Sequence, residues 1–427
     1  MVNDDLSMFS ADPVLTSLQD LSIENLRSGI LKCVPPQLLD APVPSYEVSN
    51  LRYSPGKKMV VGLTSDIGQK PISLRIFPRN NLEDRLAKAQ RVHPDHSFLM
   101  DSMNAIAWVF PAERKINLDL VGDHARLAQL LRQHRNYELC DVELMHFVPE
   151  HTYTARVLGM KNDGSLVREY IKIFADDQGE ETSRIMVDLA PKLCDARIRI
   201  PDDISYLPEH RLLIQSEVLR DSSRTLSYRA AASALATFHG LSVDGAPQRI
   251  EDIDSDHATV LELVASVLPE QLPVVRAASI AVRKALAEAP SPTNTVLVHG
   301  DAHLGNLFPV AGSDVGVIDL DQVAWGWAED DLASFFAFTI WLRLRKKQDP
   351  QLALRDLPHF VAIYNRYAEN PVIAGTVYRR LAHKLVAERI RRGIARGKVS
   401  SAAQILDFVR IAEQCLAAAR LTERGAV

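Results

Sequence analysis

The N-terminal part of the chain alternates strand-like runs with single helical stretches. Polar and apolar residues alternate in "YEVSNLRY", "MVVGLTS" and "PISLRIF" (within 46–77), and this period of two predicts β-strands. The stretch "NLEDRLAKAQRV" (81–92) has helical spacing, and "AIAWVF" (105–110) returns to a strand pattern. A predicted helix, "DHARLAQLLRQH" (123–134), then leads into a second strand-rich block.

This second block is similar to the first. It contains "DVELMHF", "TYTARVLGM" and "VREYIKIF" (within 141–174), and Asn162-Asp163-Gly164 is a typical hairpin turn. When the blocks are aligned, Pro149 lies 94 residues after Pro55, and Lys172 lies 97 residues after Arg75. We interpret this as a degenerate internal repeat of a small β-lobe, although any two hairpins with proline-led turns share part of the likeness.

From about residue 222 onward the pattern is almost wholly helical. Apolar residues recur at i, i+3 and i+4 in "SYRAAASALATFHGL" (227–241), "LPVVRAASIAVRKALAEA" (272–289) and later stretches. The β-type interruption is residues 296–322. The layout predicts an α+β fold with two lobes and a cleft between them.

Composition narrows the class of protein. The 427 residues are 47% hydrophobic and 24% charged, as in ordinary globular proteins with more than one domain, and the net charge of −5 implies no general affinity for nucleic acid. We expect neither a signal peptide nor a membrane span, because the N-terminus lacks the required pattern and "ASFFAFTIWL" (333–342) is too short. Four scattered cysteines without CxxC spacing argue against zinc or a disulfide scaffold, so we expect a reduced cytoplasmic protein.

The segment "VLVHGDAHLGNLFPVAGSDVGVIDLDQ" (296–322) gathers acids, histidines and an asparagine between apolar runs. One interpretation is phosphoryl transfer, in which a carboxylate aligns a hydroxyl while Mg²⁺ neutralises nucleotide phosphates. Strands at 307–310 and 315–318, joined by a turn at 311–314, return Asp319 towards the start of the hairpin. Asn306 and Asp319 can then share one metal while Asp301 faces the acceptor, since Mg²⁺ prefers hard oxygen ligands.

Two other interpretations compete. His299-x-Asp301-x-His303 is two thirds of a ligand triad for iron, but such a site needs another histidine, and His359 and His383 both lie in helical context. That reading also leaves the asparagine and the second acid of the segment without a role. Alternatively, the polar residues only cap helices and close turns. The apolar runs that flank them favour a functional site.

"HGDAHLGN" followed by "VIDLD" resembles the catalytic and metal loops of the aminoglycoside phosphotransferase and choline kinase-like family, which are relatives of protein kinases. The resemblance covers residues 140–340 and implies a bilobal kinase-like fold. It implies that Asp301 is the base, that Asn306 and Asp319 bind Mg²⁺, and that His299 braces the loop. His303 either steadies the loop, touches phosphate, or makes only a loop hydrogen bond.

The resemblance extends to neighbouring segments with some departures. Asp321 is expected to be a solvent-facing or outer acid rather than a metal ligand. In "GWAEDDLASF" (326–335), Asp331 matches the family's Asp-Leu-Ala, but Trp327 and Ala328 replace its Asp-Pro, which leaves the local loop shape open.

In the β-lobe a kinase of this type needs a lysine on the phosphates and an acid from the next helix to hold it. Lys172 on the predicted strand fits, and Glu181 is its expected partner, with Glu180 and Asp188 as rivals. Without the motif at 299–319, a lysine in a strand would be read as a surface residue.

The rest of the nucleotide lobe is less marked. "VPEHTYT" (148–154) stands at the phosphate-covering loop without a glycine, and the strand "RLLIQSEV" (211–218) leads to the interlobe hinge. There the resemblance places adenine against backbone groups near Glu217 and Val218. In the first β block Arg75 takes the place of the lysine and no catalytic hairpin follows, so we predict a non-catalytic cap.

The N-terminal block at 1–135 resembles the cap that precedes the kinase fold in maltokinase-like members, and the resemblance implies a kinase-like N-lobe at 136–217 and a helical C-lobe at 218–427. The predicted function is an ATP- and Mg²⁺-dependent transfer of phosphate to a hydroxyl of a small molecule such as an aminoglycoside, sugar or amino alcohol. The alternatives are an inactive nucleotide-binding module or a metalloenzyme that uses His299 and Asp301. The acidic "EDIDSDHATVLE" (251–262) and basic "VYRRLAHKLVAERIRRGIARGK" (377–398) are interpreted as solvated helix faces. The acceptor pocket is expected from helices at 240–290 and after 331.

Overall fold

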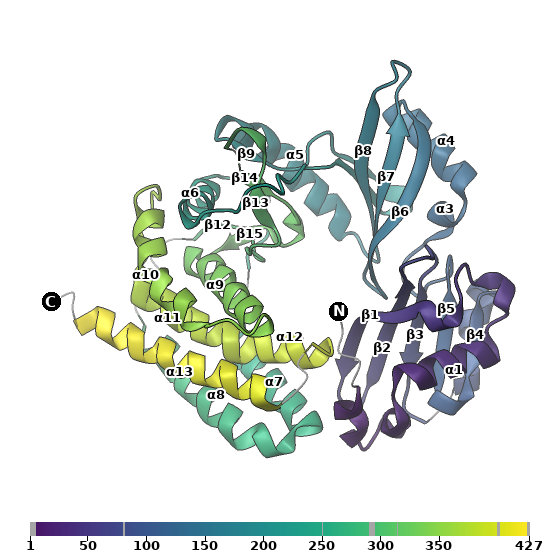
Figure 1. The fold of residues 1–427 in the computed structure, drawn as a ribbon, viewed down its shortest axis with the longest axis horizontal. Helices are drawn as coiled ribbons and strands as arrows, with labels where there is room; N and C mark the ends of the chain where they lie inside the picture. The colour runs from purple at the N-terminus through teal and green to yellow at the C-terminus, as the bar shows by residue number, and fades with distance from the viewer. Residues whose placement is uncertain are drawn as a thin grey trace.

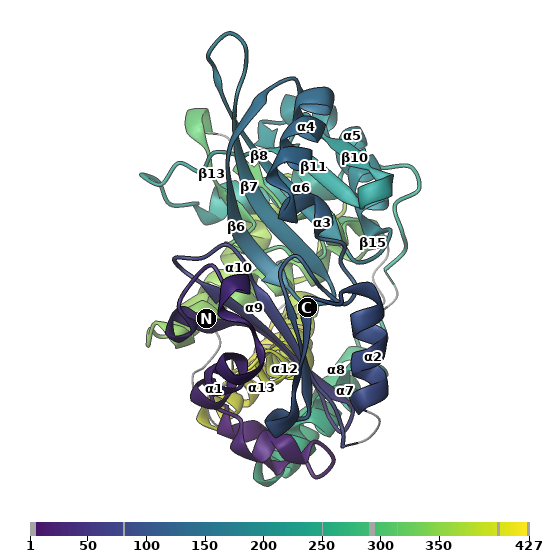
Figure 2. The same ribbon diagram turned by 90° about the vertical axis from the view of Figure 1, so that its right-hand side faces the viewer.

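The computed structural model describes residues 6–79, 82–249, 251–289, 295–313, 315–398 and 402–424. Two β-sheets lie one above the other on one side of the molecule, and the helical C-terminal part lies on the other side (Figure 1). A view from the side shows the second sheet above the first, with both termini on the lower half (Figure 2).

The first sheet follows a short N-terminal segment that includes α1 (Ile23–Cys33). Its five antiparallel strands have the order β1-β2-β3-β5-β4. A helix, α2 (Leu82–Val92), connects the third strand to the fourth. The strands are β1 (Tyr46–Ser54), β2 (Lys58–Ser65), β3 (Ile72–Ile76), β4 (Ser97–Met100) and β5 (Ala105–Val109).

The second sheet has the order β10-β11-β8-β7-β6 and is also antiparallel throughout. A long helix, α5 (Gln178–Asp195), follows its third strand. The strands are β6 (Glu138–Val148), β7 (Thr152–Met160), β8 (Leu166–Phe174), β10 (Ser205–Leu207) and β11 (Leu212–Ser216). Each strand of this sheet therefore has a counterpart in the first, in the same chain order and the same spatial order.

The register of the strands supports the repeat in detail. Arg75 on β3 pairs with Val60 and Ile106, and Lys172 occupies the matching position on β8. The N–H of Phe77 donates to the carbonyl of Asn104 at 3.1 Å, and the N–H of Phe174 donates to the carbonyl of Arg211 at 3.1 Å. Both acceptor residues have a left-handed backbone, with φ of 50° and 48°. The internal repeat interpreted from the sequence is thus present in the structure.

The boundary between the two β-lobes differs from the predicted one. The helices α3 (Asp119–Gly122) and α4 (His124–Arg135) connect the sheets. Leu127 and Leu131 of α4 share one hydrophobic cluster with Tyr153 and Ile171 of the second sheet, and the cluster begins at Phe110. By packing, the division therefore lies near residue 110 and not at 135, because the amphipathic α4 covers the second sheet.

The C-terminal part is mostly helical and surrounds a small β insertion. In its core Phe335 stacks on Phe360, and Phe336 meets both rings edge to face. Its helices are α6 (Tyr228–His239), α7 (Ile253–Val267), α8 (Leu272–Ala287), α9 (Ala328–Arg345), α10 (Gln351–Asn365), α11 (Ala374–His383), the π-helix η10 (Lys384–Arg389), α12 (Ile390–Ala395) and α13 (Ala402–Arg424). The predicted α+β class is confirmed. Among the described residues, no helix has the length and apolar character needed to cross a bilayer.

The first lobe is packed directly onto this helical part. The hydroxyl of Tyr53 on β1 donates to Asp12 at 2.7 Å and lies 3.4 Å from the hydroxyl of Ser266 on α7. Apolar residues of both regions belong to one continuous hydrophobic cluster. The first lobe therefore packs against α7 of the helical part.

Candidate active site

The predicted catalytic loop lies between two short buried strands, β12 (Val296–Val298) and β13 (Leu307–Pro309). Gly300 at its start has φ +82°, and a Cβ there would lie 2.3 Å from the carbonyl oxygen of Gln322. Both the backbone conformation and the close approach require glycine at this position. This part of the motif is therefore fixed by sterics.

Asp331, in the first turn of α9, fixes the backbone of the catalytic loop through hydrogen bonds. Its carboxylate accepts the N–H groups of His299 at 2.6 Å and Gly300 at 2.9 Å, and it also contacts His239 at 3.1 Å. Burial raises the pKa of Asp331, but the hydrogen bond from His239 and the neighbouring histidines outweigh burial and lower it. Sequence reasoning did not identify this role, although the Asp-Leu-Ala segment was the available signal.

The departure at Trp327 and Ala328 does not disturb this arrangement. The α9 helix begins at Ala328, with Trp327 as the residue before its first turn. The guanidinium of Arg380 lies 4.0 Å from the ring centroid of Trp327. A cation–π contact thus stabilises the loop where the family has Asp-Pro.

The two histidines of the loop have their ring nitrogens engaged. His299 accepts the N–H of Asp301 at Nδ1 (3.3 Å), and its Nε2 contacts the carbonyl of Ile318 at 2.9 Å. His303 accepts two loop N–H groups at Nδ1 and stacks on Phe338 at 4.2 Å. The structure thus places His299 as a brace between the two loops and His303 within the catalytic loop. A metal site on these histidines would break these contacts.

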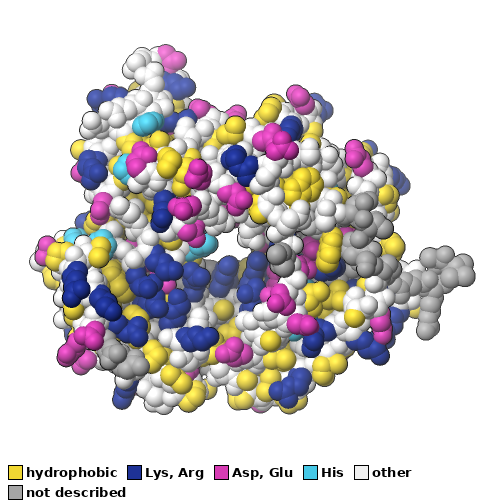
Figure 3. Space-filling model, turned by 180° about the vertical axis from the view of Figure 1, so that it is seen from behind, with side chains coloured by type: hydrophobic (Ala, Val, Ile, Leu, Met, Phe, Trp, Pro, Cys, Tyr) yellow, Lys and Arg dark blue, Asp and Glu magenta, His cyan; other side chains and the backbone are white. Residues whose placement is uncertain are grey.

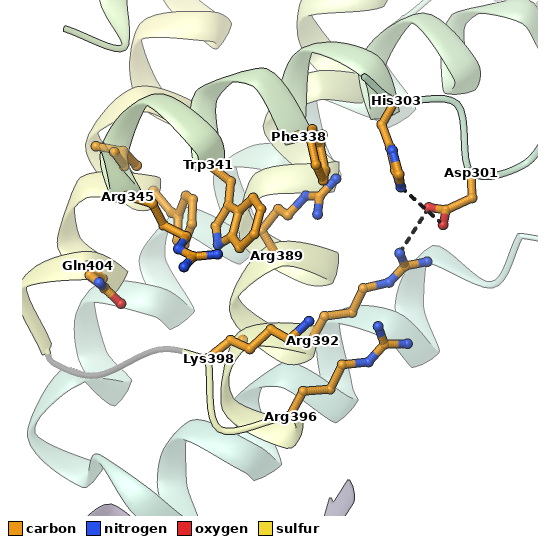
Figure 4. A pocket seen from close by; sticks show the side chains of 13 residues that line it. Asp301, His303, Phe338, Trp341, Arg345, Arg389, Arg392, Arg396, Lys398 and Gln404 are labelled. Carbon is orange, nitrogen blue, oxygen red and sulfur yellow. Dashed lines mark hydrogen bonds and ion pairs between the residues drawn. The ribbon is translucent and has the colours of Figure 1, made fainter. Parts of the chain in front are cut away.

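Asp301 points into the pocket beside the loop (Figure 4). Its carboxylate lies 3.2 Å from Arg392 and 3.6 Å from Nε2 of His303. Burial raises the pKa of Asp301, but the hydrogen bond with His303 and the charge of Arg392 outweigh it and lower the pKa well below its usual range. The group is therefore ionised at neutral pH, as a proton acceptor must be.

Asn306 and Asp319 lie at the two ends of the predicted hairpin. The strands β13 and β14 (Val315–Val317) pair antiparallel, and the N–H of Ile318 donates to the carbonyl of Asn306 at 3.0 Å. The side chain of Asn306 donates through Nδ2 to the carbonyl of Asp301 at 3.1 Å. Of the predicted turn at 311–314, Asp314 lies outside the described residues.

The donor set of this hairpin fits magnesium. The Oδ1 of Asn306 accepts no hydrogen bond from a described residue, and the side chain of Asp319 is 46% exposed. Within the described residues no three His, Cys, Asp or Glu side chains converge on a metal position. Mg²⁺ typically takes one or two carboxylates from a protein and completes its shell with phosphates and water, so an amide with one carboxylate is sufficient.

Lys172 of the second sheet reaches across to this hairpin. Its Nζ lies 3.2 Å from Oδ1 of Asp319 and also contacts the carboxylate of Asp321. Burial lowers the pKa of Lys172, but the charges of Asp321 and Asp319 outweigh it and raise the pKa. Lys172 thus reaches the hairpin that carries Asn306 and Asp319, which follows the loop of Asp301.

The expected partner of Lys172 was wrong. Glu181 is exposed on α5, and Glu180 beside it is exposed as well. Asp188, the third candidate, pairs with Lys192 at 2.7 Å. Asp321 takes the position instead, because the 3₁₀ turn after Asp319 directs it back towards the sheet. Helical periodicity alone could not reveal this contact between segments about 150 residues apart.

The interlobe segment follows β11. The N–H of Glu217 donates to the carbonyl of Arg168 at 3.1 Å, and its carboxylate accepts the hydroxyl of Tyr170 at 3.2 Å. Val218 is half-buried beside it. The proposed contact of these two residues with adenine remains a prediction.

Glu150 in the turn between β6 and β7 was not singled out from the sequence. It has φ +60°, and its side chain is only 3% exposed. Its carboxylate pairs with Arg75 at 2.5 Å, Lys58 at 3.1 Å and Arg114 at 3.1 Å. The turn at the position of the phosphate-covering loop is therefore attached to the cap.

A pocket of about 150 Å³ opens beside Asp301. The loop supplies Asp301 and His303, and α9, η10, α12 and α13 supply most of the remaining lining. Helices at 240–290 do not line this pocket, and the predicted acceptor site stays a prediction. Asp252 caps α7 by accepting the N–H of Ser255 at 2.9 Å, as expected for a helix start.

The basic stretch 377–398 turns only part of its charges to solvent, such as Arg396 and Lys398, and not all of them as expected. Arg379, Arg380 and Lys384 are buried. Arg389, Arg392, Arg396 and Lys398 line the pocket instead. An interpretation based on one apolar helical face failed here because a π-helix at Lys384–Arg389 changes the helical phase within the stretch.

Comparison with known proteins gives one family match. Residues 203–382 match the phosphotransferase enzyme family, while comparison with curated proteins gives no match. Among solved structures, an amicoumacin kinase in complex with AMP-PNP and Ca²⁺ has a TM-score of 0.46 and 15% identity, covering 67% of this chain and 92% of that one.

Two further solved structures show the same level of likeness. A spectinomycin phosphotransferase in complex with ADP and spectinomycin has a TM-score of 0.48 and 14% identity, covering 70% and 98% of the two chains. A choline kinase from Streptococcus pneumoniae has a TM-score of 0.45 and 14% identity, covering 68% and 99%. The segment that matches the phosphotransferase enzyme family, residues 203–382, includes the loop of Asp301 and the hairpin of Asn306 and Asp319.

Proposed function

We propose that this protein is an ATP- and Mg²⁺-dependent phosphotransferase that acts on a hydroxyl group of a small molecule. The observation that carries the proposal is the contact of Lys172 with Asp319 across the two lobes, next to Asp301 and Asn306. Phosphoryl transfer depends mainly on positioning and charge stabilisation, and this arrangement supplies both.

Each residue has a distinct role in this proposal. Lys172 binds the phosphates of the nucleotide, and Asn306 and Asp319 hold Mg²⁺, which when bound neutralises charge on those phosphates. Asp301, whose lowered pKa keeps it ionised at neutral pH, orients the acceptor hydroxyl and accepts its proton. His299 and Asp331 keep the loop in register, while Glu217 and Val218 provide backbone groups for adenine.

The experiment is an ATP-consumption screen across aminoglycosides, sugars, amino alcohols and nucleosides, with Asp301→Asn as the blank. The wild-type chain should phosphorylate an acceptor, and the variant should lose about 10²-fold or more of turnover because the base is gone. The affinity for Mg²⁺ and AMP-PNP should stay within about twofold, since Asp301 is not a metal ligand in this proposal. An inactive nucleotide-binding module would show no acceptor-dependent turnover and no effect of the substitution.

A further inference from the structure

The pocket beside Asp301 has an unusual charge distribution for a site next to a catalytic carboxylate. Five cationic side chains line it: Arg345, Arg389, Arg392, Arg396 and Lys398. Among the described residues that line it, Asp301 is the single acid. Arg392 is neutralised by Asp301 and by Glu388 at 3.6 Å, but no salt bridge of a described acid reaches the other four cations.

Two of these cations are held in place by aromatic rings. The guanidinium of Arg389 lies 5.5 Å from the ring of Phe338, and that of Arg345 lies 4.9 Å from the ring of Trp341. Phe338 also stacks with His303, which links these aromatic rings to the loop of Asp301. Figure 4 shows Asp301 at one end of the pocket and Arg345 at the other, with the remaining cations between them.

The positive field in this pocket is only partly compensated, by Asp301 and Glu388. Burial and the charge of Arg392 lower the pKa of Arg389 to about 10, and the same two causes lower the pKa of Arg396. From behind, a hollow at the centre of the molecule has Lys and Arg side chains gathered along one margin (Figure 3). A cationic acceptor would be repelled by this surface, whereas an anion would relieve the repulsion between the cations.

We propose, resting on the phosphotransferase function above, that the acceptor carries a phosphate or carboxylate group in addition to the hydroxyl that is phosphorylated. The hydroxyl lies at Asp301, and the anionic group is bound by Arg389, Arg396 and Lys398. The acceptor is therefore an acidic hydroxyl compound and not a cationic amino sugar or amino alcohol. These three cations lie after residue 382, outside the segment that matches the family, so the family match does not determine this specificity.

The test uses the full chain saturated with Mg²⁺ and AMP-PNP, so that the nucleotide site is filled. Inorganic phosphate and acetate are titrated separately by calorimetry at constant ionic strength, which distinguishes a phosphate site from a carboxylate site. At least one anion should bind to the wild-type chain. The double variant Arg389→Gln/Arg396→Gln should bind it about tenfold more weakly or worse, because charge-assisted hydrogen bonds are lost.

Arg355→Gln is the matched control, because Arg355 is 68% exposed on α10 and lies outside the pocket. It should bind the anion as the wild-type chain does. Circular dichroism and thermal melting check that the double variant is folded, and if it is not, Lys398→Gln tests the same field at an exposed position.

Three results would overturn the inference. They are no anion binding by the wild-type chain, equal binding by all variants, and a parallel loss of AMP-PNP affinity in the double variant, which would assign the cations to the nucleotide. None of these results contradicts phosphoryl transfer itself. A chain that binds no AMP-PNP contradicts the proposed function instead, and phosphate titration of the nucleotide-free chain then tests the pocket alone.

Discussion

The two five-stranded sheets have the same strand order but face different surroundings. The second sheet places Lys172 opposite the hairpin that carries Asp319 and Asp321. In the first sheet the matching position is Arg75, and its partner is Glu150, which belongs to a turn of the second sheet. The same scaffold thus places a cation at the same point in both lobes, and the element opposite decides what the cation binds.

The helices that follow the third strands, α5 and α2, also differ in how closely they pack. Ile185, Met186 and Leu189 of α5 are buried, whereas no residue of α2 is buried. A basic cavity of about 460 Å³ remains beside α2, lined by Arg75, Arg85 and other residues. The first lobe therefore retains the topology without the close packing of its helix. This comparison teaches that topology alone does not mark a lobe as catalytic.

The largest expected effect is on phosphoryl transfer, and it distinguishes Lys172 from Arg75. Lys172→Met should reduce phosphoryl transfer by about 10²- to 10³-fold, because a preorganised positive charge on the transferring group is removed. Arg75→Met is the matched variant and should raise the KM for ATP by about tenfold or less, since Arg75 contacts the second lobe through Glu150. Steady-state kinetics at varied ATP would check both. Equal losses in the two variants would contradict the functional difference between the lobes.

The comparison also shows what the sequence could and could not predict. The internal repeat could be predicted because strand alternation and the matched positions of Arg75 and Lys172 are local features of the sequence. The return of Asp319 towards Asn306 could be predicted because a short hairpin fixes it. The partner of Lys172 and the ion pairs of Glu150 could not be predicted from the sequence, because both depend on how distant segments pack.

The basic stretch after residue 377 marks a different limit. Its apolar spacing correctly predicted helix, but the π-helix at Lys384–Arg389 rotates the following residues relative to that spacing. Arg392 and Arg396 therefore point to the pocket beside Asp301. Charge alone does not distinguish a solvated helix face from the lining of a pocket, since the difference lies in what the opposite elements contribute.

A smaller effect, on stability, is expected from the contact of Glu150 between the two β-lobes. Glu150→Gln should lower the free energy of unfolding by about 2 kcal/mol at neutral pH, because the cations of the cap lose a buried partner. Burial raises the pKa of Glu150, but Arg75 and Arg114 outweigh burial and lower it. Its contribution is therefore present above the unfolded pKa of about 4.3 and is lost as pH falls through the folded value.

Urea unfolding of wild-type and variant chains from pH 7 down to pH 3 would measure this contribution. The difference between the two should be full at neutral pH and should shrink below about pH 4. Glu138→Gln is the control, because Glu138 is 58% exposed in its pair with Arg132 and should change stability little. A difference that does not depend on pH would show that the ionised carboxylate is not what joins the lobes.

The smallest expected effect concerns the acid on the helix of the second lobe. Glu181→Gln should change the KM for ATP by less than about twofold, because an exposed side chain without contact to Lys172 contributes little. Asp321→Asn is its counterpart and should change the KM by about tenfold, since it removes a charged partner of Lys172. The acid that orients the lysine then comes from the hairpin of the helical lobe and not from α5. If Glu181→Gln weakened ATP use as strongly as Asp321→Asn, α5 would have to approach Lys172 during turnover, and the second lobe would differ from the first by a movable helix as well as by the hairpin it faces.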